Sequence, residues 1–278
     1  MPTERGLGSG AQARPRDETP IETRRSKEVA TVLAAAFKKL IHRPIVYPSA
    51  PAGRVLYAVG DIHGRADLLR STLDRIDRDY AARSHIGEKT EVFLGDYVDR
   101  GPASAAVIET LIERASRTAA VFVRGNHEQV MLSYLARRAP LEGWATLGGL
   151  STLQSYGIAV RDREPADMWD AAWRAIPADH KKFLSETRSH CRIGEYLFVH
   201  AGMRPGIEIE NQVEDDLYWI RGEFLGCDDD FGSIVVHGHT PVPCPDMLHN
   251  RINIDTGAFI TNRLTAIRID PSGVCVVD

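Results

Sequence analysis

The chain of 278 residues is long enough for one large domain or two small ones, and a hydrophobic fraction of 43% is sufficient for a sizeable core. Its net charge of −4 excludes general affinity for nucleic acid or for an anionic membrane. No run approaches the roughly 20 apolar residues of a membrane span, and the N-terminus lacks the apolar core of a signal peptide. The four scattered cysteines predict free thiols, with disulfides as the alternative, and a cytoplasmic location.

The first 53 residues differ in composition from the rest of the chain. Residues 1–25 are rich in Gly, Pro, Arg and Thr and lack apolar periodicity, so we predict a disordered tail. Residues 26–53 predict an amphipathic helix, ended by Pro44, and a linker. We expect this helix to pack on the outside of the main domain, 54–278. In the alternative, its basic residues make it a docking element for a partner or a membrane.

Strand and helix patterns alternate three times in the first half of the main domain. Each apolar run that predicts a buried strand is followed by a segment with apolar residues at helical spacing. This order is typical of an α/β fold with its site beyond the carboxyl ends of the strands. Residues 140–190 are predicted to be mostly helical, and short β runs after them predict mixed sheets. The predicted strands are 54–60, 91–95 and 119–125, and the helices are 65–83, 104–116 and 128–138.

Five short motifs follow five predicted strands and hold the residues best suited to metal binding and catalysis. The carboxyl ends of such strands can meet at one edge of a sheet, which would bring the motifs together. The motifs are GDIHG (60–64), GDYVDRG (95–101), GNHE (125–128), HAG (200–202) and HGHT (237–240). Their candidate residues are Asp61, His63, Asp96, Asp99, Asn126, His127, His200, His237 and His239.

The donor atoms of these residues are typical of a metal site. Carboxylates, imidazoles and one amide, without a thiolate, suit Mn, Fe or Zn better than Ca or a structural zinc. Asp61 and His63, two positions apart in an extended chain, are expected to point the same way and to hold one ion. Gly-Asp and Gly-Asn are also ordinary turn sequences, and Asp is a common helix cap. Five such motifs in this order favour a metal site over five unrelated turns.

Taken in order, the motifs resemble the metallophosphoesterase superfamily, and closely its phosphoprotein phosphatase branch, which is related to the symmetrical diadenosine tetraphosphatases. The resemblance covers about residues 54–270. Bacterial-type members are the most similar, through GGLSTLQSYG (148–157), DLYWIRGEFL (216–225) and VVHGHTP (235–241) with INIDTGA (252–258). The resemblance implies an α/β four-layer sandwich, in which two mixed β-sheets are flanked by helices.

A centre of two divalent metal ions is the main implication of this resemblance. Mn is the expected metal, with Fe or Zn as alternatives. The two ions would share a hydroxide aimed in line at phosphorus. The ligands of one ion would be Asp61, His63 and Asp96, and those of the other Asp96, Asn126, His200 and His239.

The same resemblance implies roles for four further residues. Arg100 would hold phosphate oxygens in its planar guanidinium. Asp99 would orient His127, which would protonate the leaving group as general acid. Arg221 matches a later family arginine that also holds phosphate, although the matching segment is short and divergent. A surface salt bridge is the alternative for Arg221.

Several residues near the motifs are expected to act outside the metal site. His237 is predicted to support or pack against the ligands, while the family pattern favours His239 as the ligand itself. Asp255 is expected to support the fold. Trp144, Trp173 and Trp219 are expected in the core or in a pocket wall.

The resemblance favours a metal-dependent phosphomonoesterase that acts on phosphoserine or phosphothreonine in proteins or peptides. Asp99 and Glu128 favour this substrate over the alternative, a dinucleoside polyphosphate such as diadenosine tetraphosphate, or an RNA 5′ end. A non-catalytic phosphate-binding scaffold is the minor alternative. That alternative predicts a damaged site, whereas every matched residue is present. Nucleic acid is not expected as a main partner.

Overall fold

The computed structural model of the protein describes residues 45–160 and 165–277. The chain divides into two units, and only the second, Val46–Asp278, is described below. The tail predicted for residues 1–25 and the helix predicted after it lie outside the described residues, so both stay predictions. In the described part of the chain, no helix is long and apolar enough to cross a membrane.

The first sheet is mixed, because it contains both parallel and antiparallel strand pairs. Its order is β10-β9-β1-β2-β3, with β1, β2 and β3 parallel to one another. β9, from the end of the chain, pairs antiparallel with β1, where Leu56 lies opposite Ile269. The strands are β1 (Arg54–Val59), β2 (Glu88–Phe93), β3 (Ala119–Phe122), β9 (Ala266–Asp270) and β10 (Gly273–Val276).

The second sheet is also mixed and comes entirely from the second half of the chain. Its order is β4-β5-β6-β8-β7, and β5, β6 and β8 run parallel. Strands β4 and β7, which the sequence patterns did not predict, pair antiparallel at its two edges. The strands are β4 (His190–Ile193), β5 (Tyr196–Val199), β6 (Ile234–His237), β7 (Asp246–Met247) and β8 (Arg251–Asn253).

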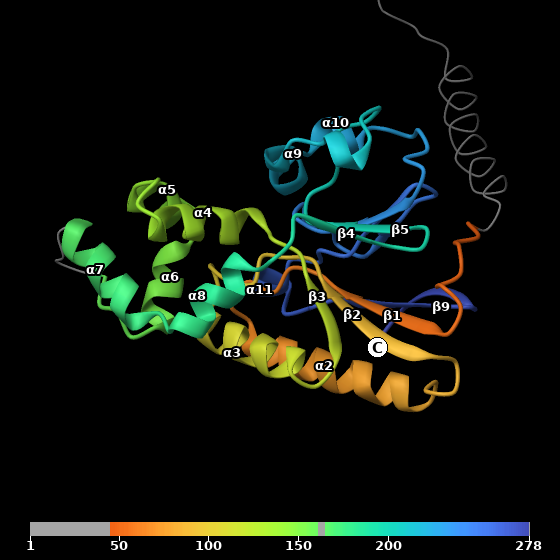
Figure 1. The fold of residues 1–278 in the computed structure, drawn as a ribbon, viewed down its shortest axis with the longest axis horizontal. Coiled ribbons are helices and arrows are strands. Elements are labelled where there is room, and N and C mark those ends of the chain that lie inside the picture. Colours follow the sequence, from red (N-terminus) through yellow and green to blue (C-terminus); the bar gives the residue numbers. More distant parts are fainter. Residues whose placement is uncertain (1–44, 161–164, 278) are drawn as a thin grey trace, which may run out of the picture. The chain divides into compact units, whose positions relative to one another are not determined.

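The two sheets lie face to face and are covered by helices on their outer faces (Figure 1). Strand β1 is apolar from Val55 to Val59 because both of its faces are buried. Leu56 points into the layer between the sheets, where it shares a cluster with Phe198 and Val236. Val55 and Tyr57 point to the opposite face and pack in the core that includes the helices α2 and α3. The predicted α/β architecture of two mixed sheets flanked by helices is confirmed.

The helices predicted in the first half are present with shifted boundaries. α4 begins at Asn126, two residues before the predicted start, so Asn126 and His127 lie in its first turn. The long helices are α2 (Ala66–Ala81), α3 (Ser104–Ala115) and α4 (Asn126–Leu135). The next four are α5 (Leu141–Thr146), α6 (Gly149–Ser155), α7 (Pro165–Ala175) and α8 (Ala178–Ser185). The short ones after β5 are η1 (Ile209–Asn211), α9 (Glu214–Trp219), α10 (Gly222–Leu225) and α11 (Ala258–Thr261).

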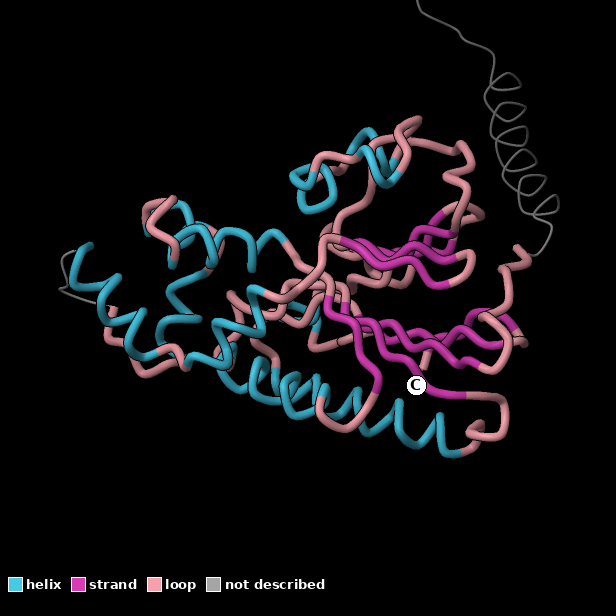
Figure 2. The backbone as a smooth tube through the Cα atoms, in the orientation of Figure 1, coloured by secondary structure: helices cyan, strands magenta, loops and turns pink. Residues whose placement is uncertain are grey.

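The loops that carry the five motifs gather at one end of both sheets (Figure 2). Parallel strands of one sheet end at the same edge, so the loops after β1, β2 and β3 become neighbours. The loops after β5 and β6 reach the same place from the second sheet: the Gly238 amide donates to the His200 carbonyl at 2.8 Å. The topology thus joins motifs that are far apart along the chain.

Candidate metal centre

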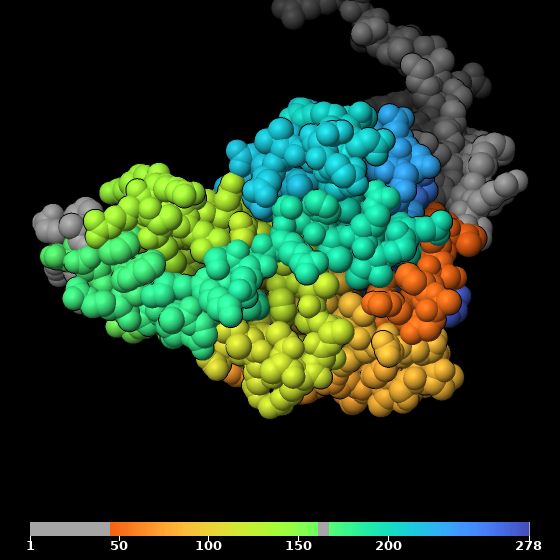
Figure 3. All heavy atoms as spheres, viewed as in Figure 1, coloured from red at the N-terminus to blue at the C-terminus, as the bar shows by residue number. Residues whose placement is uncertain are grey.

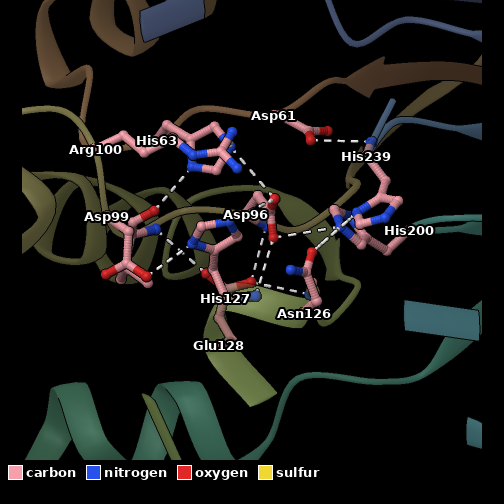
Figure 4. Close-up of polar contacts among 12 residues, drawn as sticks. Asp61, His63, Asp96, Asp99, Arg100, Asn126, His127, Glu128, His200 and His239 are labelled. Atoms are coloured by element: carbon pink, nitrogen blue, oxygen red, sulfur yellow. Dashed lines mark hydrogen bonds and ion pairs between the residues drawn. The ribbon is translucent and has the colours of Figure 1, made fainter. Parts of the chain in front are cut away.

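Asp96 lies at the middle of the gathered motifs (Figure 4). Its carboxylate is buried, with a relative exposure of 2%. One oxygen, Oδ2, lies 3.3 Å from Nε2 of His63, and the other, Oδ1, lies 3.3 Å from Nε2 of His200. Each oxygen of this single carboxylate therefore faces a different histidine, so the site has two halves that share Asp96.

The first half of the site contains His63 and Asp61. Nδ1 of His63 lies 3.0 Å from the Val98 carbonyl, which can only accept, so Nδ1 carries the proton and Nε2 keeps its lone pair. Asp61 accepts a hydrogen bond from the His239 amide at Oδ2, 3.0 Å away. Its other oxygen, Oδ1, is buried and has no hydrogen-bond partner among the described residues. A buried carboxylate oxygen without a partner is costly unless a cation compensates it.

The second half of the site brings together side-chain atoms that can bind a metal ion. Nε2 of His200 lies 2.9 Å from Oδ1 of Asn126 and 3.2 Å from Nδ1 of His239. Nδ1 of His200 lies 2.8 Å from the Leu94 carbonyl, which places the proton of the ring there. Nε2 of His200, Oδ1 of Asn126 and Oδ1 of Asp96 thus converge as acceptors, which is the arrangement that a divalent cation requires.

The electrostatics of the centre agree with bound cations. Burial lowers the pKa of His63 to about 3 and that of His239 to about 2, so both rings are neutral, as ligands must be. Burial, followed by the charges of Asp255 and Asp96, raises the pKa of Asp61 well above its usual value. Asp61, Asp96 and His63 therefore fit a divalent ion, which would relieve the repulsion between the carboxylates.

Two exposed arginines contact histidines at opposite ends of the centre. The Nη1 group of Arg100 donates to Nε2 of His63 at 2.9 Å, and its guanidinium lies 4.7 Å from the ring centre of Phe259. At the other end, Nε of Arg221 donates to Nε2 of His239 at 3.0 Å. The surface salt bridge considered as the alternative for Arg221 is absent among the described residues, and Arg221 lies at the centre instead.

His127 and Asp99 form a buried pair beside Asp96. Nδ1 of His127 lies 2.7 Å from Oδ2 of Asp99, while its Nε2 lies 3.7 Å from Oδ2 of Asp96. This Nε2 has no hydrogen-bond partner in the part of the chain that the structure describes. Burial lowers the pKa of His127, but Asp96 and Asp99 outweigh this effect and the pKa lies above its usual value. A histidine held in this way can carry a proton at Nε2.

Side chains from helices α5 and α6 form hydrogen bonds with the Asp99 carboxylate. The indole Nε1 of Trp144 donates to both oxygens of Asp99 at 3.0 Å, and the Thr152 hydroxyl donates to Oδ1 at 2.6 Å. The Asp99 amide donates to the Thr152 hydroxyl oxygen at 2.8 Å. Trp144 is thus in the core, as expected, but with a polar role that the sequence patterns did not indicate.

Glu128 organises the loop that carries Asp96. Its carboxylate accepts hydrogen bonds from the amides of Asp96 (2.8 Å), Tyr97 (2.8 Å), Val98 (3.2 Å) and Gly125 (2.9 Å). Glu128 is completely buried. Its carboxylate is therefore occupied in holding the loop that carries Asp96.

Replacing Glu128 by Ala is expected to lower the free energy of unfolding by about 3 kcal/mol, because four buried amide donors lose their acceptor. Glu128→Gln keeps one acceptor oxygen and is expected to lose less. Glu113→Ala, on the solvent side of α3, is the matched control and should change the value by less than about 0.5 kcal/mol. Unfolding in urea gives the free energy of unfolding of each of the three variants and of the wild type. Equal stability of Glu128→Ala and the wild type would contradict this role.

The backbone turns sharply at the residues that form the centre. His63, Asp96 and His239 have φ of 47°, 51° and 65°. The extended alternation expected for Asp61 and His63 is therefore wrong, because His63 adopts a left-handed conformation. A Cβ atom on Gly125 would lie 2.1 Å from Oδ1 of Asp96, so only glycine fits there.

The remaining predicted residues lie at the edge of the centre. His237 is fully buried, and its ring contacts Phe224 with centroids 4.9 Å apart, whereas His239 faces His200. Asp255 lies two residues after the end of β8, is buried, and accepts a hydrogen bond from the Gly257 amide at 2.9 Å. Its charge acts on Asp61, so Asp255 lies closer to the centre than the predicted fold-supporting role implied. In the sequence, this nearness to the centre could have been inferred from the position of Asp255 shortly after a strand, where the other motifs also lie.

A comparison with protein families identifies the kind of domain that carries this centre. A family model described as calcineurin-like phosphoesterase matches residues 55–264. The chain belongs to this family. Its members are hydrolases that use divalent metal ions, so the predicted metallophosphoesterase class of enzyme is confirmed. The structure also groups Asp96 with His63 and His127, and with His200 and His239, as residues able to hold an ion.

Relatives of this calcineurin-like phosphoesterase share a name. The asymmetrical bis(5′-nucleosyl)-tetraphosphatase PrpE of Halalkalibacterium halodurans is 26% identical over 228 residues, which cover 76% of this chain and 88% of that protein. The protein of the same name from Anoxybacillus flavithermus is 29% identical over 230 residues, with the same coverage.

Solved structures show the same fold. A candidate diadenosine tetraphosphatase superimposes with a TM-score of 0.57 at 22% identity, covering 84% of this chain and 96% of that one. A cold-active protein tyrosine phosphatase gives a TM-score of 0.58 at 15% identity, covering 84% of this chain and 78% of that one. At these identities the likeness concerns the fold alone.

Proposed function

We propose that this calcineurin-like phosphoesterase hydrolyses dinucleoside tetraphosphates into two unequal products. The observation that carries the proposal is the set of relatives named asymmetrical bis(5′-nucleosyl)-tetraphosphatases, aligned over 76% of this chain and 88% of their own length. Unequal cleavage leaves three phosphates on one nucleoside and one on the other. This substrate was the alternative in the sequence analysis, and it now replaces the phosphoprotein as the first candidate.

The preference for a phosphoprotein depended on Asp99 and Glu128, and neither residue can recognise a substrate. Glu128 is occupied by four backbone amides, and Asp99 is buried between His127, Trp144 and Thr152. Substrate choice belongs to the exposed residues around a site rather than to such internal supports. A scaffold without activity is disfavoured because the complete set of predicted residues lies together.

In this proposal two divalent ions, with Mn as the expected metal, occupy the two halves of the centre. Bound ions of this kind activate water and neutralise phosphate oxygens. Asp96 supplies one oxygen to each half, which explains why both of its oxygens face a histidine. The ligands proposed for the first half are Asp61, His63 and Asp96, and those for the second half are Asp96, Asn126, His200 and His239.

The other predicted residues bind phosphate groups or donate a proton. Arg100 and Arg221 lie exposed at opposite ends of the centre, where planar guanidinium groups can bind successive phosphates of a polyphosphate. His127 donates a proton from Nε2 to the departing phosphate oxygen, while Asp99 holds Nδ1 and fixes the orientation of the ring.

A phosphoserine or phosphothreonine ester is the second candidate, supported by the His127–Asp99 pair. A departing alkoxide is more basic than a departing phosphate, so it depends more strongly on a proton donor. The buried pair, with its 2.7 Å contact, would serve such a leaving group well.

The test compares the two substrates on metal-stripped protein reloaded with Mn²⁺. Diadenosine tetraphosphate and a phosphoserine peptide are supplied separately, and the products are resolved by ion-exchange chromatography. The proposal expects a nucleoside triphosphate and a nucleoside monophosphate in equal amounts, at a kcat/KM well above that for the peptide. Two nucleoside diphosphates would make cleavage symmetrical and contradict the proposal. Preference for the peptide would establish the phosphoprotein instead.

A further inference from the structure

An exposed tryptophan stands beside the second half of the metal centre. Trp219, the last residue of α9, has a relative exposure of 39%, and its ring meets that of His239 edge-on, with centroids 6.1 Å apart and planes at 82°. Its Nε1 donates to Oε1 of Gln129 at 2.7 Å, and Nε2 of Gln129 donates to Oδ1 of Asp215 at 2.7 Å. These bonds hold the indole in place while part of its surface stays open to solvent.

The first half of the centre has an apolar neighbour of its own. Phe259 on α11 lies between His63, with ring centroids 5.2 Å apart, and the guanidinium of Arg100, 4.7 Å from its ring centre. The next residue, Ile260, has a relative exposure of 69%. Phe259 is partly buried by these contacts, whereas Ile260 leaves an apolar side chain open to solvent beside the charged centre.

The two ends of the centre are built alike. At one end a histidine, an arginine and an exposed aromatic ring are adjacent, and these are His239, Arg221 and Trp219. At the other end His63 and Arg100 adjoin the partly buried ring of Phe259, and the exposed apolar side chain there is that of Ile260. Asp96 lies between His63 and His239 in Figure 4, and its carboxylate contacts His63 on one side and His200, the neighbour of His239, on the other. The order apolar, cationic, metal centre, cationic, apolar matches a ligand with an aromatic base at each end and phosphates between.

We propose that Trp219 and the Phe259–Ile260 pair are the two nucleobase subsites of this protein. One base stacks on the open face of Trp219, and the other lies against Phe259 and Ile260, while Arg221 and Arg100 hold the phosphates between them. Stacking on an aromatic side chain is tolerant of base identity, because every base has a π-face. The inference deepens the proposed function and rests on it.

The surface of the molecule is uneven next to helix α9. Figure 3 shows the surface indented between the helices α4 and α5 on one side and α9 on the other. A hydrogen bond between Trp219 of α9 and Gln129 of α4 joins these two helices. Because part of the Trp219 indole is open to solvent, a base could stack on it without entering the core.

The test replaces Trp219 by Ala and by Phe and measures KM and kcat for diadenosine tetraphosphate. Trp219→Ala is expected to raise KM roughly 10- to 100-fold, the effect of losing one stacked base. Trp219→Phe keeps an aromatic ring, so its KM is expected to stay much closer to that of the wild type. Glycerol phosphate, which has no base, should keep its KM in both variants. Trp173→Ala is the matched control, because Trp173 is similarly exposed (46%) but lies on α7, stacked on Trp169. Ile260→Ser should raise KM for the dinucleotide by a smaller factor.

A second readout does not depend on turnover. A methylene-bridged, non-hydrolysable analogue of diadenosine tetraphosphate is expected to quench the indole fluorescence of the wild type, and Trp219→Phe should remove most of this quenching. Unchanged KM and unchanged quenching in the Trp219 variants, with the wild type active on the dinucleotide, would refute the Trp219 subsite alone. Unchanged KM in Ile260→Ser would refute the second subsite. A wild type that hydrolyses glycerol phosphate but not the dinucleotide would refute the proposed function and the subsites with it.

Discussion

Replacement of Asp96 by Asn is expected to abolish turnover and divalent metal binding together. The carboxylate places one oxygen 3.3 Å from His63 and the other 3.3 Å from His200, so it is the only described carboxylate that serves both halves of the centre. An amide offers one oxygen and no charge, so the variant loses both the shared ligand and the negative charge that attracts two cations to the centre. Nothing in the fold requires the charge itself, so the variant should still fold.

Metal content by elemental analysis, together with kcat, measures this effect. Asp61→Asn is the informative comparison, since Asp61 belongs to the first half only. We expect it to reduce the metal content to one ion per chain, while Asp96→Asn loses both. Circular dichroism shows whether each variant is folded. Asp96→Asn with full metal content or full activity would disprove the shared-carboxylate arrangement.

Replacement of His127 by Asn is expected to reduce kcat by ~10²–10⁴-fold, the usual worth of a general acid, and to leave the metal content unchanged. His127 reaches Asp96 only at 3.7 Å, whereas its 2.7 Å contact is with Asp99, so its main partner is the orienting carboxylate. The geometry also allows His127 to be a ligand, because it lies within reach of His63 and Asp96. Metal analysis of this variant decides between the two roles.

The dependence of kcat on the basicity of the leaving group tests the role of His127 more sharply. Loss of a proton donor matters most for a basic leaving group, so His127→Asn should be least impaired on an aryl phosphate with an acidic phenol. Asp99→Asn, which removes the orienting carboxylate, should show the same dependence with a smaller loss. Equal losses on all leaving groups, or a reduced metal content, would exclude His127 as the proton donor.

The sequence by itself determined the family, the kind of fold and the identities of the residues that meet at the centre. Asp61, Asp96 and His200 each follow a buried strand, and strands of this type end at one edge of a sheet. Short-range rules are sufficient for such conclusions, because strand periodicity and the residue after a strand are properties of a few neighbouring positions. The boundary of α4 was less accurate: Gly125 is the cap of the helix and its amide donates to Glu128, so the helix already begins at Asn126.

Only the tertiary structure decided which residues support the centre and which are open to solvent beside it. Trp144 and Thr152 are 45 and 53 residues from Asp99 along the chain, and no local pattern links them to it. Glu128 looked like a specificity residue in the sequence, yet its contacts with buried amides make it a support of the loop. Long-range packing creates these contacts. It also brings Trp219 to the rim of the centre, where exposure and neighbours, rather than residue type, determine what a side chain can bind.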